Sequence, residues 1–142
     1  MNRTGNILIP VIMLAALALS CAAAMSNETL HKMVLLRLKD LETKVFYLSE
    51  SGLEHGKVLI AKDNSWFTEE NTVTDDKSRL LTVSSGAIYL FGEGGYKIIR
   101  QRSQNRLYSV GFIGSDILKS AAFSFQRIDF EMPLRTKKWE EF

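Results

Sequence analysis

Two short segments carry the aromatic and charged side chains best suited to bind another molecule. In the first, Trp66 and Phe67 stand in a polar stretch, residues 63–77, that also contains Glu69 and Glu70. Aromatic residues are enriched at binding hot spots because they bury a large area at low entropic cost. We therefore predict that Trp66 is an exposed anchor, with Phe67, Glu69 and Glu70 beside it.

The second segment is basic. It begins at Tyr96, contains Arg100 and Arg102, and is followed by Arg106 beyond a turn. Guanidinium groups form charge-assisted hydrogen bonds with acidic groups. This cluster therefore favours an acidic protein or a glycosaminoglycan as its ligand, and a solvated turn is the plainer alternative. We include Tyr96, Arg100 and Arg102 among the candidate binding residues.

Side chains for catalysis or metal binding are scarce. His31 and His55, the only histidines, do not form a metal-binding motif, and we expect both to be solvated. The acidic residues of the stretch 63–77 do not have EF-hand spacing. No G-x-S-x-G motif occurs, and residues 92–95 (GEGG) lack the Lys-Ser/Thr of a phosphate-binding loop. The sequence predicts no enzyme activity, no metal and no cofactor.

The N-terminus has the pattern of a secretory signal peptide. Arg3 precedes an uncharged run at residues 7–19, and Ala22 and Ala24 supply the small residues of a cleavage site. As a helix, that run spans about 20 Å, less than a hydrocarbon core of about 30 Å. We therefore predict a signal peptide at residues 1–24 and no membrane span after its removal.

Cys21 and Asn27 leave two modifications open. Residues 18–21 (ALSC) resemble a bacterial lipobox in which Cys21 would be lipidated, although Ala18 stands where Leu is usual. Residues 27–29 (NET) form an N-glycosylation acceptor if the chain enters a eukaryotic secretory pathway. A mature chain starting at Met25 would contain no cysteine.

The composition fits one globular domain. The chain has 142 residues, 46% of them hydrophobic, and a net charge of +2, too small to recruit nucleic acid or an anionic membrane unaided. Residues 30–41 fit a short helix or a strand, and residues 63–77 a long loop. Segments rich in β-forming residues and separated by turn signals predict strands at residues 57–61, 79–84, 87–91, 96–101, 107–112 and 123–132. Short strands at this spacing argue for a small barrel or sandwich.

The last of these segments changes its hydrophobic phase. Phe123 and Phe125 alternate on odd positions, whereas Ile128, Phe130 and Met132 alternate on even positions. Such a change moves apolar side chains to the other face of a strand. We therefore predict a bend or bulge near residues 126–127.

Two stretches resemble SH3 domains. Residues 76–91 (DKSRLLTVSSGAIYLF) place a glycine-containing turn between two apolar strands. Residues 110–118 (VGFIGSDIL) are similar to the SH3 ending, where a Gly-aromatic pair precedes a one-turn helix. Together with the export signal, these stretches resemble one extracellular SH3-like family, that of melanoma inhibitory activity protein, otoraplin and the lumenal head of the transport-and-Golgi-organisation cargo receptor. Three further segments are similar to parts of that family: residues 38–41 (LKDL), 56–57 (GK) and 136–140 (TKKWE).

The resemblance covers residues 38–142 and implies an all-β fold, an SH3-like small barrel with short N- and C-terminal extensions. The chain lacks the family's disulfide cysteines. Asn64, Tyr96 and Gly114 stand where SH3 domains have an aromatic residue, a Trp and a Pro, so binding of proline-rich peptides has little basis.

Together these patterns predict a secreted or lumenal monomer with a signal peptide (1–24), an N-terminal extension (25–56) and an SH3-like domain (57–142). Its function would be non-catalytic protein binding through the loops 63–76 and 92–95, because loops on a rigid scaffold carry recognition. The resemblance implies matrix or secretory cargo proteins as partners. The alternative is a bacterial envelope lipoprotein with an SH3-like fold, anchored through Cys21.

Overall fold

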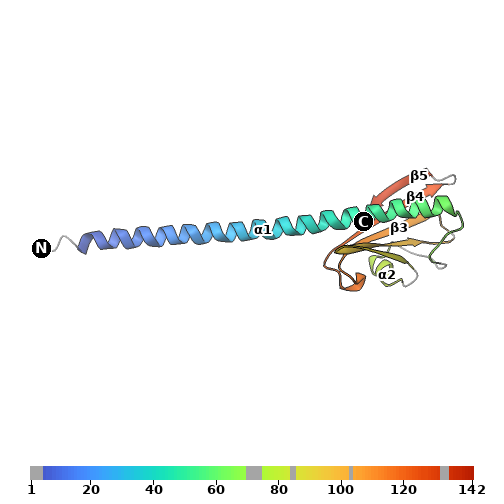
Figure 1. Ribbon diagram of the computed structural model, residues 1–142. Helices are drawn as coiled ribbons and strands as arrows, with labels where there is room; N and C mark the ends of the chain where they lie inside the picture. Colours follow the sequence, from blue (N-terminus) through green and yellow to red (C-terminus); the bar gives the residue numbers. More distant parts are fainter. Residues whose placement is uncertain (1–4, 70–74, 84–85, 103, 132–134) are drawn as a thin grey trace. The chain divides into compact units, whose positions relative to one another are not determined.

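The computed structural model describes residues 5–69, 75–83, 86–102, 104–131 and 135–142. The chain divides into two compact units, Met1–Lys39 and Asp40–Phe142. Helix α1 (Gly5–Lys62) contributes to both units (Figure 1). The other elements all belong to the second unit.

The second unit is built on one five-stranded antiparallel sheet. Its strands run in the order β1-β2-β3-β4-β5, and each pairs with its neighbours in sequence. Their bounds are Ala87–Phe91, Gly94–Arg100, Arg106–Ile113, Phe123–Glu131 and Arg135–Glu141. In the described residues β1 and β5 are the open edges of this meander. The predicted all-β SH3-like barrel is therefore wrong, because the fold is mixed α/β and the sheet does not close.

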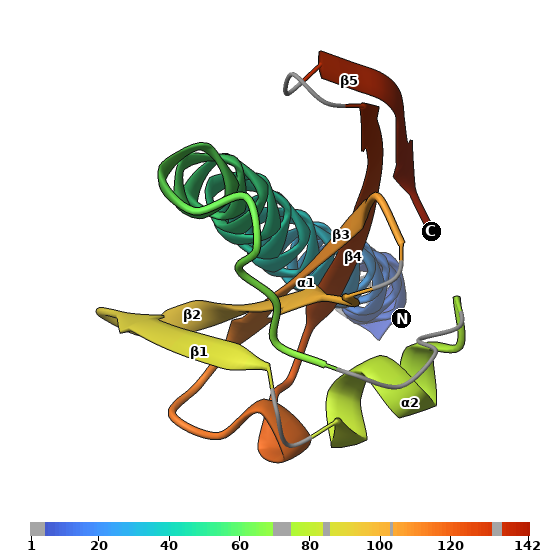
Figure 2. The same ribbon diagram turned by 90° about the vertical axis from the view of Figure 1, so that its right-hand side faces the viewer.

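Helices cover both faces of the sheet (Figure 2). Residues 40–62 of α1 lie on one face, and α2 (Lys77–Thr82) and the 3-10 turn η1 (Ile117–Lys119) lie on the other. The α1-side core consists of Leu53, Ile60, Tyr96, Ile98, Leu107, Ile128 and Phe130. The α2-side core consists of Leu80, Ile99, Tyr108, Val110, Phe112, Ile117 and Phe125. A sheet between two apolar layers buries both sides of its central strands.

This arrangement explains the phase change in β4. Phe125 belongs to the α2-side core, whereas Ile128 and Phe130 belong to the α1-side core. The pairing of β3 with β4 continues without a shift from Arg106↔Asp129 to Phe112↔Phe123. Of the bend or bulge predicted near residues 126–127, the bulge is therefore wrong, since alternate residues of a strand with regular pairing to β3 serve two cores. A register shift does occur at residues 129–130, on the side of β4 that faces β5.

Residues 57–61 are the C-terminal end of α1, not the predicted strand. Val45, Leu53 and Ile60 are each 2% exposed, and Ser49 is fully buried. These positions recur at helical spacing, so one stripe of α1 faces the sheet. The apolar run at residues 58–60 hides this periodicity, because a short continuous run fits a strand and a buried helix equally well.

Residues 77–82 form α2 where a strand was predicted at 79–84. Asp76 is its N-cap, and its carboxylate accepts a hydrogen bond of 3.0 Å from the backbone N–H of Ser78. At the other end, the buried Lys97 of β2 donates from Nζ to the carbonyl oxygens of Leu80 and Leu81, at 3.1 and 3.2 Å, and to that of Val83. Capping at both ends thus outweighs the strand propensity of this segment.

Helix α1 approaches β3 closely along a row of small residues, which we call the glycine seam: Gly52 and Gly56 of α1 and Gly111 of β3. A Cβ at Gly52 would lie 2.1 Å from Ser109 Oγ, and one at Gly56 would lie 2.5 Å from a Leu107 methyl group. A Cβ at Gly111 would lie 2.1 Å from the carbonyl oxygen of Val45. Both elements have glycine where they meet, and the absence of a Cβ at these positions lets the helix pack directly on the strand.

The contact between Gly52 and Ser109 in the glycine seam includes a hydroxyl group whose removal should stabilise the protein. Ser109 Oγ is buried and has no hydrogen-bond partner in the described structure. We expect Ser109→Ala to raise the free energy of unfolding by about 1 kcal/mol, because the desolvated hydroxyl is removed. We expect Gly52→Ala to lower it by about 2 kcal/mol, and by less in the Ser109→Ala background. Thermal unfolding in detergent of the wild type, the two single variants and the double variant measures the coupling between residues 52 and 109. Additive effects would show that Ser109 does not limit the approach.

The remaining strand predictions hold with small shifts. The strand at 87–91 is confirmed as β1, and those at 96–101, 107–112 and 123–132 correspond to β2, β3 and β4. Residues 136–140, interpreted as a C-terminal extension, lie in the fifth strand. Charged residues occupy most of β5, and this conceals its β character.

The first unit consists of the N-terminal part of α1, with exposed side chains throughout residues 8–39. The sequence has no charge between Arg3 and Glu28. The helical part of that stretch, residues 5–27, is about 35 Å long at 1.5 Å per residue, enough to cross a hydrocarbon core of about 30 Å. The length of about 20 Å applies to residues 7–19 alone; residues 20–27 are uncharged and helical as well and lengthen the stretch. Helix α1 also passes the predicted cleavage site at residue 24 and the predicted domain boundary at residue 56 without a break.

Candidate binding site

The segment that follows α1 folds onto the end of β2. Asp63 Oδ1 accepts hydrogen bonds from the N–H and the hydroxyl of Ser65, at 2.9 and 2.6 Å, which fixes a tight turn. Thr68 then forms three hydrogen bonds with Arg100. Its N–H donates to the Arg100 carbonyl at 2.9 Å, and its hydroxyl accepts from the Arg100 N–H at 2.8 Å and donates to the same carbonyl at 3.3 Å. These bonds place Trp66 and Phe67 beside the arginines of β2 and its following turn.

Arg100 is the buried centre of this region. The residue is 6% exposed. Its Nη1 donates to the carbonyl oxygens of Asn64 and Trp66, at 3.1 and 2.6 Å. Its guanidinium carbon lies 5.3 Å from the centre of the Phe130 ring. Burial lowers the pKa of Arg100, and the nearby Asp63 carboxylate opposes that effect.

A pocket of about 330 Å³ opens between these groups. It is lined by Asn64, Ser65, Trp66, Phe67, Arg100 and Arg102. The Arg102 guanidinium carbon lies 4.8 Å from the centre of the Phe67 ring, a cation–π contact. Trp66 is half-buried and packs against the α1-side core. Four of the predicted binding residues, Trp66, Phe67, Arg100 and Arg102, therefore meet at one pocket, which we call the Arg100 pocket.

The other candidate residues are not among those that line this pocket. Tyr96 is buried in the α1-side core, and its hydroxyl is 2.9 Å from His55 Nδ1, so His55 is not the solvated residue we expected. Glu69 forms an isolated bridge with Gln101 next to the pocket. Glu70 lies outside the described residues. Cys21 and Asn27 are exposed on α1.

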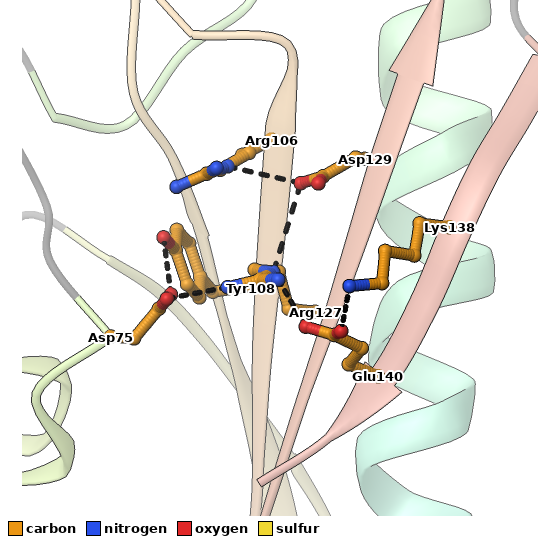
Figure 3. Close-up of polar contacts among 7 residues, drawn as sticks. All are labelled: Asp75, Arg106, Tyr108, Arg127, Asp129, Lys138 and Glu140. Carbon is orange, nitrogen blue, oxygen red and sulfur yellow. Dashed lines mark hydrogen bonds and ion pairs between the residues drawn. The ribbon is translucent and has the colours of Figure 1, made fainter.

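An ion-pair network on β3, β4 and β5 was missed by the sequence reasoning (Figure 3). Arg127 of β4 contacts Asp75, Glu140 and, at 3.7 Å, Asp129. Arg106 reaches Asp129 at 3.0 Å, and Lys138 pairs with Glu140. The Tyr108 hydroxyl donates to Asp75 at 2.9 Å, and burial raises the pKa of this phenol.

Strand register explains the network. Arg127 is directly opposite Tyr108 on one side and Glu140 on the other, and Asp129 is opposite Arg106 and Lys138. The alternating charges at 127, 129, 138 and 140 were the available signal, but it can be read only when residues 135–141 are recognised as a strand. Because its charges are paired with one another, this network fits a structural role.

The described residues do not form a metal-binding site. No group of three or more His, Cys, Asp or Glu side chains comes together among them in a way that would hold an ion. The Arg100 pocket, with its cation and aromatic walls, is thus the strongest candidate site of the second unit.

Comparison with known proteins adds no relative: no family model, no curated protein and no solved structure matches the chain. Membership of the extracellular SH3-like family stays a prediction, and the barrel that it implied is not formed.

Proposed function

We propose that the protein is a membrane-anchored binding protein, in which the N-terminal part of α1 crosses a lipid bilayer and the second unit binds another molecule without catalysing a reaction. The proposal is carried by the exposed apolar surface of the first unit. Nine large hydrophobic side chains between Leu8 and Met25 are 59–74% exposed. Burying each is worth about 1.5–3 kcal/mol, so leaving all of them in water would cost more than about 10 kcal/mol.

A bilayer suits this segment in three respects. It is long enough to cross the hydrocarbon core, an 18-residue window within it reaches a mean hydropathy of 2.4, and a helix satisfies its own backbone hydrogen bonds. Pro10 lies inside the helix and removes one backbone donor, a loss that membrane helices tolerate. The non-catalytic role is supported by the sequence, which has no recognisable nucleophile or phosphate-loop motif.

Two arginines in the middle of the segment test the anchor. Each arginine at the centre of a membrane helix costs about 2.5–3.5 kcal/mol. We therefore expect a Leu14→Arg, Leu17→Arg double variant to leave the membrane fraction in an alkaline wash, whereas the wild-type chain is released only by detergent. The matched control is Leu35→Arg with Leu36→Arg, at two exposed positions beyond the uncharged stretch, which should remain in the membrane.

Intact-mass measurement of the wild-type chain decides between anchoring and processing. An unprocessed N-terminus in the detergent fraction supports the membrane anchor. A chain that begins at Met25 and stays in the wash would contradict it and would support secretion after cleavage at Ala24, for which Ala22 and Ala24 are suited. A chain that begins at a diacylated Cys21 would replace the helical anchor with a lipid anchor.

A further inference from the structure

Arg100 has capacity for hydrogen bonding that the described residues do not use. Nη1 is occupied by two carbonyl oxygens, but Nε is buried and has no hydrogen-bond partner in the described structure. No carboxylate of the described residues lies within 4.0 Å of this guanidinium. Asp63 is the nearest acidic influence on it, yet Asp63 Oδ1 accepts from Ser65. A buried cation without a counter-ion is unfavourable unless something else compensates its charge.

The Arg100 pocket is where a compensating group can approach. Arg100 forms one wall, Trp66 and Phe67 supply aromatic surface, and Arg102 lies over the Phe67 ring. A volume of about 330 Å³ is at the small end of ligand sites, and pockets that combine apolar walls with a few polar groups are typical of such sites. The pocket therefore fits a small group with one charged end and one apolar end.

From these contacts we infer that the Arg100 pocket binds a carboxylate carried on an apolar group, with the carboxylate at Arg100 and the apolar part against Trp66 and Phe67. A planar carboxylate matches the planar guanidinium. A dianion such as phosphate is disfavoured, because the carbonyl oxygens of Asn64 and Trp66 and the Asp63 carboxylate already lie close to the cation. The inference deepens the proposed function by naming the ligand chemistry, and it rests on that function only for the statement that the second unit binds.

Two sources can supply this chemistry: a free small acid, or the C-terminal residue of a peptide or protein. The test uses the full chain in detergent micelles and follows Trp66 fluorescence in a Trp139→Phe background, since the protein has two tryptophans. Four probes are titrated: 3-phenylpropionate, its neutral amide, an N-acetylated tripeptide ending in Phe with a free carboxylate, and the same tripeptide amidated. We expect at least one of the two acids to bind at least tenfold more tightly than its amide. A response to 3-phenylpropionate alone indicates a free acid, and tighter binding of the tripeptide acid indicates a chain terminus.

Arg100→Met should lower the affinity for the acid at least tenfold, because the charged donor is lost. Arg135→Gln, at an exposed position on β5, is the charge-matched control and should bind as the parent chain does. If Arg100→Met does not fold, Phe67→Ala takes its place: it keeps the cation and should weaken both acids by removing the apolar wall. Equal binding of acid and amide, or an unchanged affinity in Arg100→Met, would overturn the inference.

The outcome is separable from that of the membrane test. If the chain binds the acid but is found in the wash fraction, the pocket inference stands and the membrane-anchor proposal fails. If the chain is held in the membrane but binds acid and amide equally, the membrane-anchor proposal stands and the pocket inference fails.

Discussion

Gly111→Ala is expected to lower the free energy of unfolding by about 3 kcal/mol or more, the largest stability effect of any single methyl group that we foresee in this chain. The new Cβ would lie 2.1 Å from the Val45 carbonyl oxygen and 2.6 Å from the Ser49 backbone nitrogen. Both atoms belong to the backbone of α1, so no side-chain rotation can relieve the contact. The helix would have to move off the sheet, which would loosen the α1-side core.

Thermal unfolding followed by circular dichroism measures this effect. For a unit of this size, about 3 kcal/mol corresponds to a fall in Tm of about 12 °C or more. The control is Gly92→Ala, which adds the same methyl group where no atom lies within 4 Å. Gly92 has a φ of 56°, so its replacement should cost about 1 kcal/mol from backbone strain alone. If Gly111→Ala and Gly92→Ala had the same Tm, the close approach of helix and strand would be refuted.

Arg127→Met is the second change with a large expected effect. The Arg127 side chain is 11% exposed and contacts three carboxylates. Among the described residues, removing it leaves Asp75 with the Tyr108 hydroxyl as its one hydrogen-bond partner, whereas Lys138 and Arg106 still compensate Glu140 and Asp129. We expect a loss of about 2 kcal/mol at neutral pH, less than for a fully buried pair because the carboxylates keep contact with water.

The loss should depend on pH. Burial raises the pKa of Asp75, but hydrogen bonds from Arg127 and Tyr108 outweigh it, so the net shift is downward. The pKa of Glu140 is also lowered, first by Lys138 and then by Arg127. A carboxyl group with a lowered pKa in the folded state stabilises the protein above its unfolded-state pKa, near 4, and loses that contribution as the pH falls through the folded-state value. The difference in Tm between wild type and Arg127→Met should therefore be largest near pH 7 and shrink below pH 4.

Lys137→Met supplies the matched control. Lys137 pairs with Glu131, and both side chains are more than half exposed, so the change should cost less than about 0.5 kcal/mol at any pH. A difference for Arg127→Met that stayed the same at pH 3 and pH 7 would mean that its packing, not its charge, holds the strands together.

The strands from β1 to β4 could be predicted because their β-forming residues are bounded by clear turn signals, such as the glycines at 92 and 94–95. The barrel was wrong because the length of α1 was missed. Residues 41–62 carry Ser49, Gly52 and Gly56 on the buried stripe, and small residues of this kind suggest a turn rather than the inner face of a helix. Only the matching gap on β3, at Gly111, shows why they are needed.

The candidate site was half predictable. The types of Trp66, Phe67, Arg100 and Arg102 made them candidate binding residues, and the structure gathers all four at one pocket. Their mutual placement depends on the pairing of Thr68 with Arg100, a contact between residues 32 positions apart that leaves no local pattern. Tyr96 was assigned to the same surface because it is near in sequence. It does share the α1-facing side of β2 with Arg100, but four residues of strand, about 13 Å, separate the two, and Tyr96 is buried in the α1-side core.

The glycine seam also offers a way to trace ancestry. Relatives that have diverged beyond detectable similarity can exchange one apolar core residue for another, but they cannot add bulk where two backbones touch. A template requiring small residues at positions equivalent to 49, 52 and 56 of a long N-terminal helix, together with a glycine in the middle strand of a later five-strand meander, would select such chains by shape. Distant kin of this protein should thus be recognisable by what they leave out.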